Sequence, residues 1–153
     1  MSPLVAVALL MSTVAASPLN NVSFTNTVGK GAGCFQVILW SREGGLMATY
    51  VSRCRWGDYG LESGLLFNEK PTNTFTIDST DDETVKKYNR FIKQSKIGCN
   101  DSVTFEKGDM YEFMYYPNSG KGTLEIPIGG ALRWFIPGTC PGQLESRSLQ
   151  SPS

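Results

Sequence analysis

The chain has 153 residues, with 14 basic and 14 acidic side chains and no histidine, so its formal net charge is zero. Because no basic patch is evident in the sequence, this charge balance argues against nucleic acid as the main ligand. Without histidine the chain cannot form a Ser-His-Asp or Cys-His catalytic site or most zinc and copper sites, and we expect no metal and no cofactor.

Residues 4–16, LVAVALLMSTVAA, form an uncharged apolar stretch. Its length suits the core of a signal peptide and is too short to span a bilayer. We expect cleavage after Ala16, which predicts a signal peptide over residues 1–16 and a secreted, extracellular protein. The alternative is a buried N-terminal strand or helix of a cytosolic protein. No other segment is apolar for long enough to anchor the chain, so we expect no membrane span.

Residues 17–33 are polar and glycine-rich, as is typical of a flexible arm, and the serine-rich stretch 143–153 is typical of a disordered tail. Residues 34–142, between them, are enough for a single β-rich domain with a core of its own. Two N-x-S sequons, at Asn21 and Asn100, predict a glycoprotein.

Four cysteines in a secreted chain predict two disulfides, and their wide spacing does not fit a zinc site. They are Cys34, Cys54, Cys99 and Cys140. Four cysteines allow three pairings, and the sequence alone does not decide among them.

The first two cysteines bracket a predicted β-hairpin. Segments 34–40 and 46–54 are rich in β-branched and aromatic residues and flank the turn sequence REGG. A three-residue loop over 43–45 would place Arg42 opposite Leu46 and Cys34 opposite Cys54. Opposed Cβ atoms in a sheet lie about 4.5–5.5 Å apart, which is near what a disulfide needs. We therefore favour the pairing Cys34–Cys54 with Cys99–Cys140 over the nested pairing Cys34–Cys140 with Cys54–Cys99.

Residues 55–63, RWGDYGLES, read as a glycine-rich loop that carries two aromatic side chains. Loops on a rigid sheet often carry binding residues, and an aromatic side chain with charged neighbours could anchor a protein or stack on a sugar. The candidate binding residues are Arg55, Trp56, Asp58 and Tyr59. The structural alternative is that Trp56 covers one end of the core.

One helix is predicted after two short strands, GLLF and NTFTID. Thr80 and Glu83 have the spacing of a capping box, and Gly98 is a natural C-terminal stop. An apolar face follows at helical spacing, and lysines and an arginine occupy the rest of the surface. The residues of the apolar face are Val85, Tyr88, Phe91 and Ile92.

Four further strands are expected after the helix: SVTFE, MYEFMYY, TLEIPI and ALRWFI. Pro127 cannot donate to a β-ladder, which favours an edge strand or a bulge at that position. The expected fold class is α+β: a mainly antiparallel β-sheet, with one amphipathic helix packed against it and two disulfides.

Carboxylates are the acid–base groups available for catalysis. A glycosidase needs two of them facing each other across a cleft. The most suggestive pair is Glu112 and Glu125, on neighbouring predicted strands. A register with residue 115 opposite 123 places Glu112 opposite Ile126, so the two glutamates would lie on different faces. We therefore assign no catalytic residue.

In its general plan the chain resembles small secreted fungal proteins of the effector type: a signal peptide, a β-rich domain of this size, two disulfides and no catalytic signature. One subgroup has a ribonuclease-like scaffold without catalytic residues, and the order hairpin, helix, meander over residues 34–140 is similar to it. YEF at 111–113 corresponds to its catalytic glutamate strand. The chain departs from that scaffold in its Gly-Ala-Gly-Cys start, its extra short strands and its lack of histidine. The resemblance implies a virulence role without nuclease activity.

The expected function is that of a secreted, monomeric, non-catalytic binding protein that acts on a protein or glycan target of a host or of the extracellular space. One alternative is a carboxylate-based hydrolase of glycans or RNA. Another is a carrier of small apolar ligands, which would need a large closed cavity inside the sheet.

Overall fold

The computed structural model describes residues 19–28, 33–42, 45–54, 59–99, 103–118 and 120–141, without the side chains of Arg42 and Tyr59. The predicted signal peptide, the predicted tail and the Asn100 sequon lie outside the described residues. No helix in the described ranges is long and apolar enough to cross a membrane.

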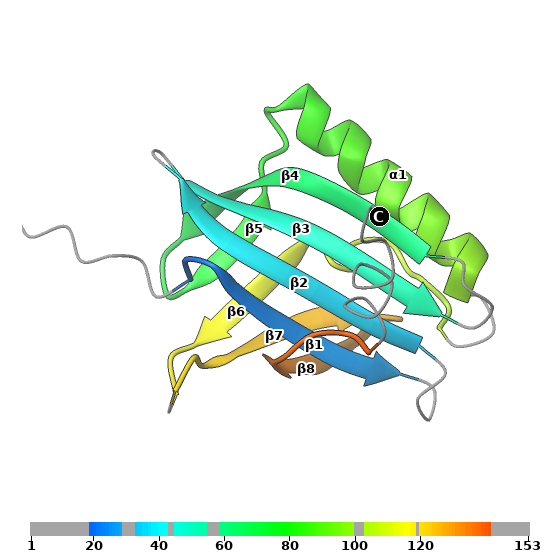
Figure 1. Ribbon diagram of the computed structural model, residues 1–153. Helices are drawn as coiled ribbons and strands as arrows, with labels where there is room; N and C mark the ends of the chain where they lie inside the picture. Colours follow the sequence, from blue (N-terminus) through cyan, green and yellow to red (C-terminus); the bar gives the residue numbers. More distant parts are fainter. Residues whose placement is uncertain are drawn as a thin grey trace, which may run out of the picture.

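Eight antiparallel strands form a closed barrel, and one helix lies between the fifth and sixth strands (Figure 1). In chain order the elements are β1 (Val22–Val28), β2 (Gly33–Arg42), β3 (Gly45–Cys54), β4 (Tyr59–Lys70), β5 (Thr74–Ile77), α1 (Asp82–Cys99), β6 (Glu112–Tyr116), β7 (Thr123–Ile128) and β8 (Ala131–Pro137). Each strand pairs with its neighbours in the sequence, and β1 pairs with β8 to close the barrel.

The expected α+β fold, with a helix packed against an open sheet, is wrong, because the strands form a closed barrel. The difference arises from β1, a strand that the sequence did not predict. This strand comes from residues 17–33, which we expected to be a flexible arm. Val22, Phe24 and Val28 point inward and are almost fully buried, whereas Ser23, Thr25 and Thr27 point to the other face and are more exposed. The asparagines, serine and threonines of the segment concealed this apolar pattern, and only the pairing of β1 with both β2 and β8 makes the strand stable.

Strand bounds differ from the expectation in two more places. Residues 59–63 belong to β4 rather than to a loop, and residues 103–106 are not a strand, so three strands follow the helix. In β4, Gly64 is skipped by the pairing with β3 and has a φ of +78°. A glycine with positive φ is typical of a β-bulge, which lets the long strand bend around the barrel.

Pro127 does not lie in an edge strand, because β7 pairs on both sides, with β6 and with β8. The ladder with β6 covers only residues 123–125, so Pro127 lies beyond it. The Pro127 carbonyl instead accepts a hydrogen bond from the amide of Met110 at 2.9 Å. The missing amide hydrogen is thus tolerated in an inner strand, at the point where one ladder has ended.

The barrel interior is filled largely by aromatic side chains. The rings of Phe67 and Phe113 are 5.2 Å apart, those of Phe75 and Phe113 are 5.1 Å apart, and Tyr50 lies 5.9 Å from Phe67. The largest fully buried side chains include Tyr50, Phe24, Phe35, Phe91, Phe113 and Phe135. This interior is a packed core built from the inward faces of the strands.

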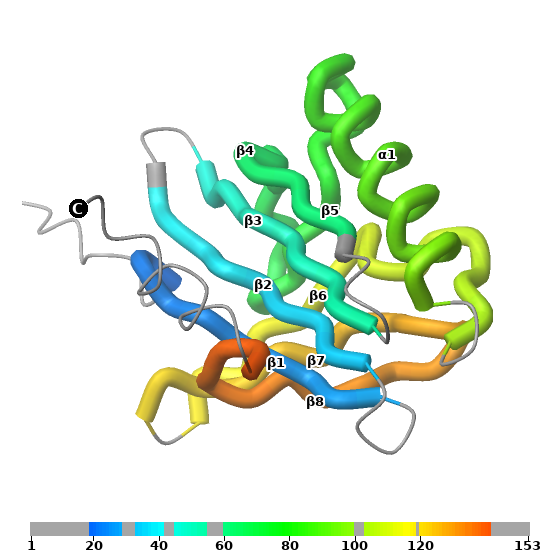
Figure 2. The backbone as a smooth tube through the Cα atoms, turned by 45° about the vertical axis from the view of Figure 1, so that its right-hand side comes forward, coloured from blue at the N-terminus to red at the C-terminus, as the bar shows by residue number. Residues whose placement is uncertain are grey.

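α1 covers one end of the barrel interior, next to β3 and β4 (Figure 2). The Phe91 ring is fully buried and lies 5.4 Å from the inward-facing Tyr50, and the hydroxyl oxygens of Ser95 and Ser52 are 2.6 Å apart. The predicted apolar face is confirmed at Phe91, and Tyr88 and Ile92 pack partly buried against the same core. The helix therefore depends on the barrel for its stability, as most protein helices depend on their packing.

The start of α1 differs by one residue from the predicted capping box. The carboxylate of Asp81 accepts the amide hydrogen of Thr84 at 2.9 Å, so Asp81 is the N-cap. Thr80 instead donates to Asp78 in the preceding turn. The Thr84 hydroxyl accepts the amide hydrogen of Leu66 at 3.2 Å, which connects this end of the helix to β4. Gly98 lies inside the last turn, and α1 ends at Cys99.

The disulfides follow the nested pairing, Cys34–Cys140 and Cys54–Cys99, so the favoured pairing is wrong. In the β2–β3 hairpin Arg42 pairs with Gly45, one position away from the expected register, which places Cys34 opposite Arg53. A slip of one residue moves a side chain to the other face of a sheet. Cys34 therefore points outward and Cys54 inward, and the two cannot bond to each other.

Each disulfide connects a different part of the chain to the hairpin. Cys54 forms a disulfide with Cys99, the last residue of α1. Gly33 lies opposite Cys54 in the ladder between β2 and β3. A Cβ atom on Gly33 would lie 2.8 Å from the Cys54 sulfur, so a side chain there would displace this disulfide. Cys34 forms a disulfide with Cys140, which follows β8. The backbone amide of Cys140 also donates a hydrogen bond to the side-chain oxygen of Gln36 at 3.1 Å.

Peptide mapping under non-reducing conditions should find only the pairs 34–140 and 54–99. The closed loops span 106 and 45 residues, so chain entropy predicts a loss of about 4–5 kcal/mol of unfolding free energy when either pair is replaced by alanines. Urea unfolding of the two double variants measures this loss. A peptide that joins Cys34 to Cys54 would contradict the hairpin register.

The turn after α1 is held by two tyrosine hydroxyls. Tyr50 donates to the Met110 carbonyl at 2.9 Å, and Tyr88 donates to the Asp109 carbonyl at 2.7 Å. Met110 has a φ of +57°, a backbone conformation that methionine rarely adopts. Burial raises the pKa of Tyr50, with a smaller contribution from Tyr88, and burial followed by the charge of Asp109 raises the pKa of Tyr88.

These raised pKa values predict a loss of stability in alkali. Unfolded tyrosine ionises near pH 10, whereas the two folded tyrosines stay protonated to higher pH, so the unfolding free energy is unaffected below pH 10 and falls above it. The fall should approach about 1.4 kcal/mol per pH unit for each tyrosine. Urea unfolding between pH 8 and 11.5 checks this, and Tyr88→Phe should show a shallower fall. Equal slopes in the two proteins would contradict the assignment.

Candidate interaction surface on β8

Most of the loop predicted to bind a partner lies outside the described residues. Arg55, Trp56 and Asp58 lie outside the described residues, and Tyr59 is described only by its backbone, as the first residue of β4. The start of this loop differs from the expectation, because Cys54 bonds to Cys99 at the end of α1 and not to Cys34 across the hairpin. The predicted loop site stays a prediction.

Two further carboxylates, Glu62 and Asp109, are buried and have structural partners. Glu62 forms a two-point ion pair with Arg90 of α1, in which one of the two contacts is 2.9 Å long. The hydrogen bond and the charge of Glu62 raise the pKa of Arg90. The Asp109 carboxylate accepts the amide hydrogens of Glu106 and Gly129, both at 2.7 Å. Both carboxylates hold elements together and face no open cleft.

Glu112 and Glu125 lie on the same outer face of the barrel, which corrects the register that we expected. Glu125 pairs with Met114, two residues after Glu112. Glu112 accepts hydrogen bonds from Thr76 at 2.7 Å and from Lys70 at 3.3 Å. The face is the outside of a closed barrel, so the two carboxylates do not face each other across a substrate. In the described part of the chain, no group of three or more possible protein ligands could hold a metal ion.

A row of exposed apolar side chains runs along the outside of β8. Leu132 is 65% exposed, Trp134 51% and Ile136 58%. Their neighbours point inward: Phe135 is fully buried, and the Arg133 guanidinium donates to the Ile128 carbonyl at 3.1 Å. Strand alternation therefore places three large apolar groups side by side in solvent.

Side chains of β6 and β7 extend this row across the barrel. Trp134 pairs with Glu125 of β7, and Glu125 pairs with Met114 of β6, which is 37% exposed. The rings of Tyr116 and Trp134 are 5.1 Å apart and tilted by 58°. We name this group the β8 surface, and it consists of Leu132, Trp134, Ile136, Met114, Tyr116 and Glu125. The surface is apolar at its centre and has one carboxylate beside the tryptophan.

Glu125 and Tyr116 form the polar part of the β8 surface. The Tyr116 hydroxyl donates to the Glu125 carboxylate at 3.4 Å. Desolvation, followed by the negative charge of Glu125, raises the pKa of Tyr116. The hydroxyl therefore remains a hydrogen-bond donor throughout the physiological pH range.

The sequence does not single out the β8 surface, because ALRWFI is apolar on both faces of a strand. Such a segment is typical of a strand that is covered on both sides. The alternation of Leu132, Trp134 and Ile136 was a usable signal, but only the closure of the barrel shows that this set faces outward.

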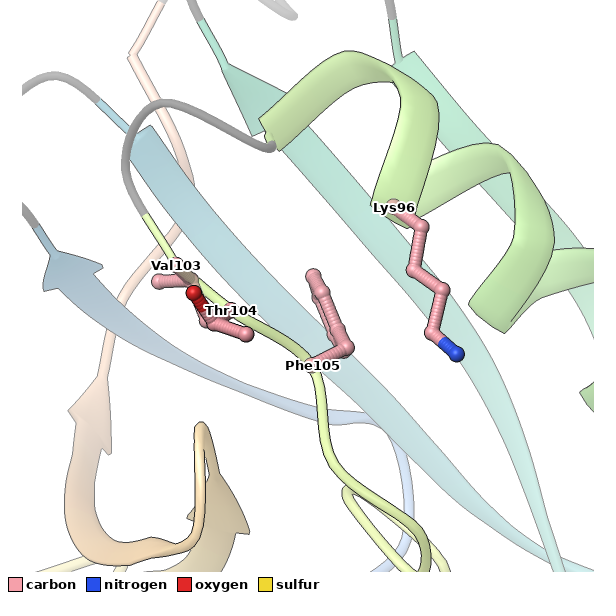
Figure 3. Close-up of a pocket in the computed structure, with 4 residues that line it drawn as sticks. All are labelled: Lys96, Val103, Thr104 and Phe105. Atoms are coloured by element: carbon pink, nitrogen blue, oxygen red, sulfur yellow. The ribbon is translucent and has the colours of Figure 1, made fainter.

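A hollow of about 290 Å³ lies between α1 and the segment that follows it, and this segment packs near Gly129 in the turn between β7 and β8 (Figure 3). The hollow is lined by Lys96, Val103, Thr104 and Phe105. The Lys96 ammonium group and the Thr104 hydroxyl are exposed at this hollow, whereas Val103 and Phe105 are largely buried.

The coupling between Tyr116 and Glu125 can be measured by titration. Glu125→Gln removes the negative charge and should lower the pKa of Tyr116 toward the ordinary value near 10. NMR of ring-labelled tyrosine follows the ionisation of this residue. Glu112→Gln is the matched control, because Glu112 lies on the same face and bonds to Lys70 and Thr76 instead. An unchanged Tyr116 titration in the Glu125 variant would disprove the coupling.

Comparison with protein-family models, with curated proteins and with solved structures finds no significant match for this chain. The β8 surface is therefore the strongest indication of function in the described residues.

Proposed function

We propose that the protein is a non-catalytic binding protein and that its β8 surface contacts a protein partner. The observation that carries the proposal is the row Leu132, Trp134 and Ile136, each more than half exposed on one strand. Burial of a large apolar side chain contributes about 1.5–3 kcal/mol. A contiguous exposed apolar patch is typical of a surface that another molecule covers.

The composition of the β8 surface favours a protein over a glycan at this place. Protein interfaces have an apolar centre enriched in Trp, Tyr and Met, with polar groups at the rim. Trp134 and Met114 form such a centre here, and Glu125 lies at the rim. Leu132 and Ile136 offer neither a flat ring to a sugar nor a hydrogen bond to its hydroxyls.

The absence of catalysis is supported by the chemistry that the chain offers. There is no histidine in the sequence, and the carboxylates discussed above are paired inside the fold or lie on the convex outside of the barrel. The interior is occupied by aromatic side chains in mutual contact, which argues against a carrier for small apolar ligands. A role in binding through the outer surface remains the best supported.

We further propose that the protein is secreted and that its target belongs to a host or to the extracellular space, as for small secreted effector proteins. Two disulfides support this, because disulfides persist in oxidising compartments. The sequon residue Asn21 is exposed, as an acceptor of a glycan must be. The predicted loop with Trp56 is retained as a second candidate contact.

Replacement of Trp134 tests the β8 surface. A partner is first captured from host extracellular fluid, identified and purified, and its Kd is then measured by calorimetry. Trp134→Ala should weaken binding by about 30-fold, which corresponds to the 2 kcal/mol typical of an anchor residue. Leu132→Ser with Ile136→Ser should weaken it further.

Ile97→Ser is the matched control, because Ile97 is 68% exposed and lies on α1, away from β8. It should leave the Kd within a factor of two of the unmodified protein. Unfolding midpoints confirm that all variants are folded. A Kd that depends on Ile97 and not on Trp134 would overturn the assignment of the β8 surface.

A further inference from the structure

A second surface, on the opposite side of the barrel from β8, carries a row of positive charges. α1 lies across the barrel from β8 in both views (Figures 1 and 2). Its outer side has four exposed basic residues within three turns, and no acidic residue follows Glu83 in the helix. We name these residues the α1 cationic face: Lys86, Arg90, Lys93 and Lys96.

Most of this positive charge is not neutralised by the protein itself. Arg90 pairs with Glu62, whereas Lys86, Lys93 and Lys96 form no ion pair with any acidic residue in the described ranges. Lys87 adds a fifth, half-buried positive charge on the same helix. Since a helix rises 1.5 Å per residue, the row from Lys86 to Lys96 is about 15 Å long. Such a row attracts an extended anionic molecule.

The row ends at the hollow beneath Lys96. Lys96 of α1 and Thr104 of the segment that follows it lie on two sides of this hollow, and the Phe105 ring at its base is largely buried (Figure 3). The volume of about 290 Å³ is at the low end of ligand sites, so it suits one small ring rather than a larger ligand. The Lys96 ammonium group and the hydroxyl of the exposed Thr104 can bind a charged group and a hydroxyl of one sugar unit, whereas Phe105 is packed against Phe35 in the core.

We propose that the α1 cationic face binds a linear anionic polysaccharide and that one of its sugar units enters the hollow beside Lys96. The carboxylate or sulfate groups of successive sugars pair with the basic side chains along the helix. This surface is separate from the β8 surface, so the inference goes beyond the proposed protein contact. The protein would then hold an anionic glycan on one side and a protein on the other.

Two other anionic partners fit the surface less well. A membrane-bound helix inserts an apolar face into the lipid, but the apolar side of α1 packs on the barrel, and Ile97 is the one large apolar side chain described as exposed on the helix. Single-stranded nucleic acid requires aromatic rings on which bases stack, and the outer side of α1 has none. A row of charges that ends in a sugar-sized hollow favours the glycan.

The test measures binding of the whole secreted protein to immobilised heparin and to polygalacturonate, in 0.15 M salt, with neutral dextran as the blank. The two polymers separate sulfate from carboxylate recognition. The unmodified protein should bind at least one of them and not dextran, and binding should weaken as salt is raised. No binding to either anionic polymer would overturn the proposal.

Two charge-reversal variants locate the site. Lys93→Glu with Lys96→Glu should weaken binding at least 10-fold. Lys107→Glu with Lys121→Glu changes the net charge equally at exposed positions outside α1, and it should change binding less than two-fold. Equal loss in the two variants would show general charge attraction and overturn the site. Unfolding midpoints verify that both variants are folded.

Further measurements test whether the hollow belongs to the site, whether the site is distinct from the β8 surface, and which anionic ligand it prefers. Thr104→Val keeps the charge and should weaken polysaccharide binding several-fold, whereas an unchanged affinity would remove the hollow from the site. Trp134→Ala should bind the polysaccharide normally, which distinguishes this site from the β8 surface. Tighter binding to anionic phospholipid vesicles or to single-stranded RNA than to either polysaccharide would overturn the choice of ligand.

Discussion

Closure of the barrel between β1 and β8 is the contact on which the other features depend. The ladder contains only two pairs, Phe24 with Pro137 and Thr25 with Ile136. Side chains reinforce it: the Ser23 hydroxyl donates to the Gly138 carbonyl at 2.8 Å, and the Asn26 amide donates to the Trp134 carbonyl at 2.7 Å. The disulfide Cys34–Cys140 then attaches the chain beyond β8 to β2. The closure thus places Trp134 and its neighbours on the outside.

Closure also explains why function is to be sought on the surface. Once eight strands surround the interior, their inward side chains fill the space, and the aromatic rings at centroid distances of 5.1 to 5.9 Å occupy it. The remaining opening is covered by α1, whose Phe91 contacts the core. The apolar residues of α1 are used in that contact, so its basic residues are left in solvent.

Buried polar groups fix the positions of the covering elements. Glu62 and Arg90 connect α1 to β4, the hydroxyls of Ser52 and Ser95 connect α1 to β3, and Asp109 connects the turn after the helix to the turn between β7 and β8. Removal of Arg90 would leave the buried Glu62 carboxylate unpaired, and removal of either serine or of Asp109 would leave a buried hydroxyl or buried amide hydrogens unsatisfied. The buried carboxylates of Glu62 and Asp109 therefore have structural roles in holding α1 and the turn after it.

The sequence by itself determined most of the local elements, the number of disulfides and the lack of histidine chemistry. Strand and helix periodicities are local, so the β2–β3 hairpin, the apolar face around Phe91 and the strand ALRWFI could be predicted from their own residues. Only the tertiary structure decided the rest: the pairing of β1, the one-residue register that separates Cys34 from Cys54, and the exposure of Trp134. The pairing of β1 and the exposure of Trp134 depend on contacts between residues far apart in the chain, and strand alternation alone does not say which face a distant partner will cover. The hairpin register depends on the length of its turn, which the sequence REGG left open.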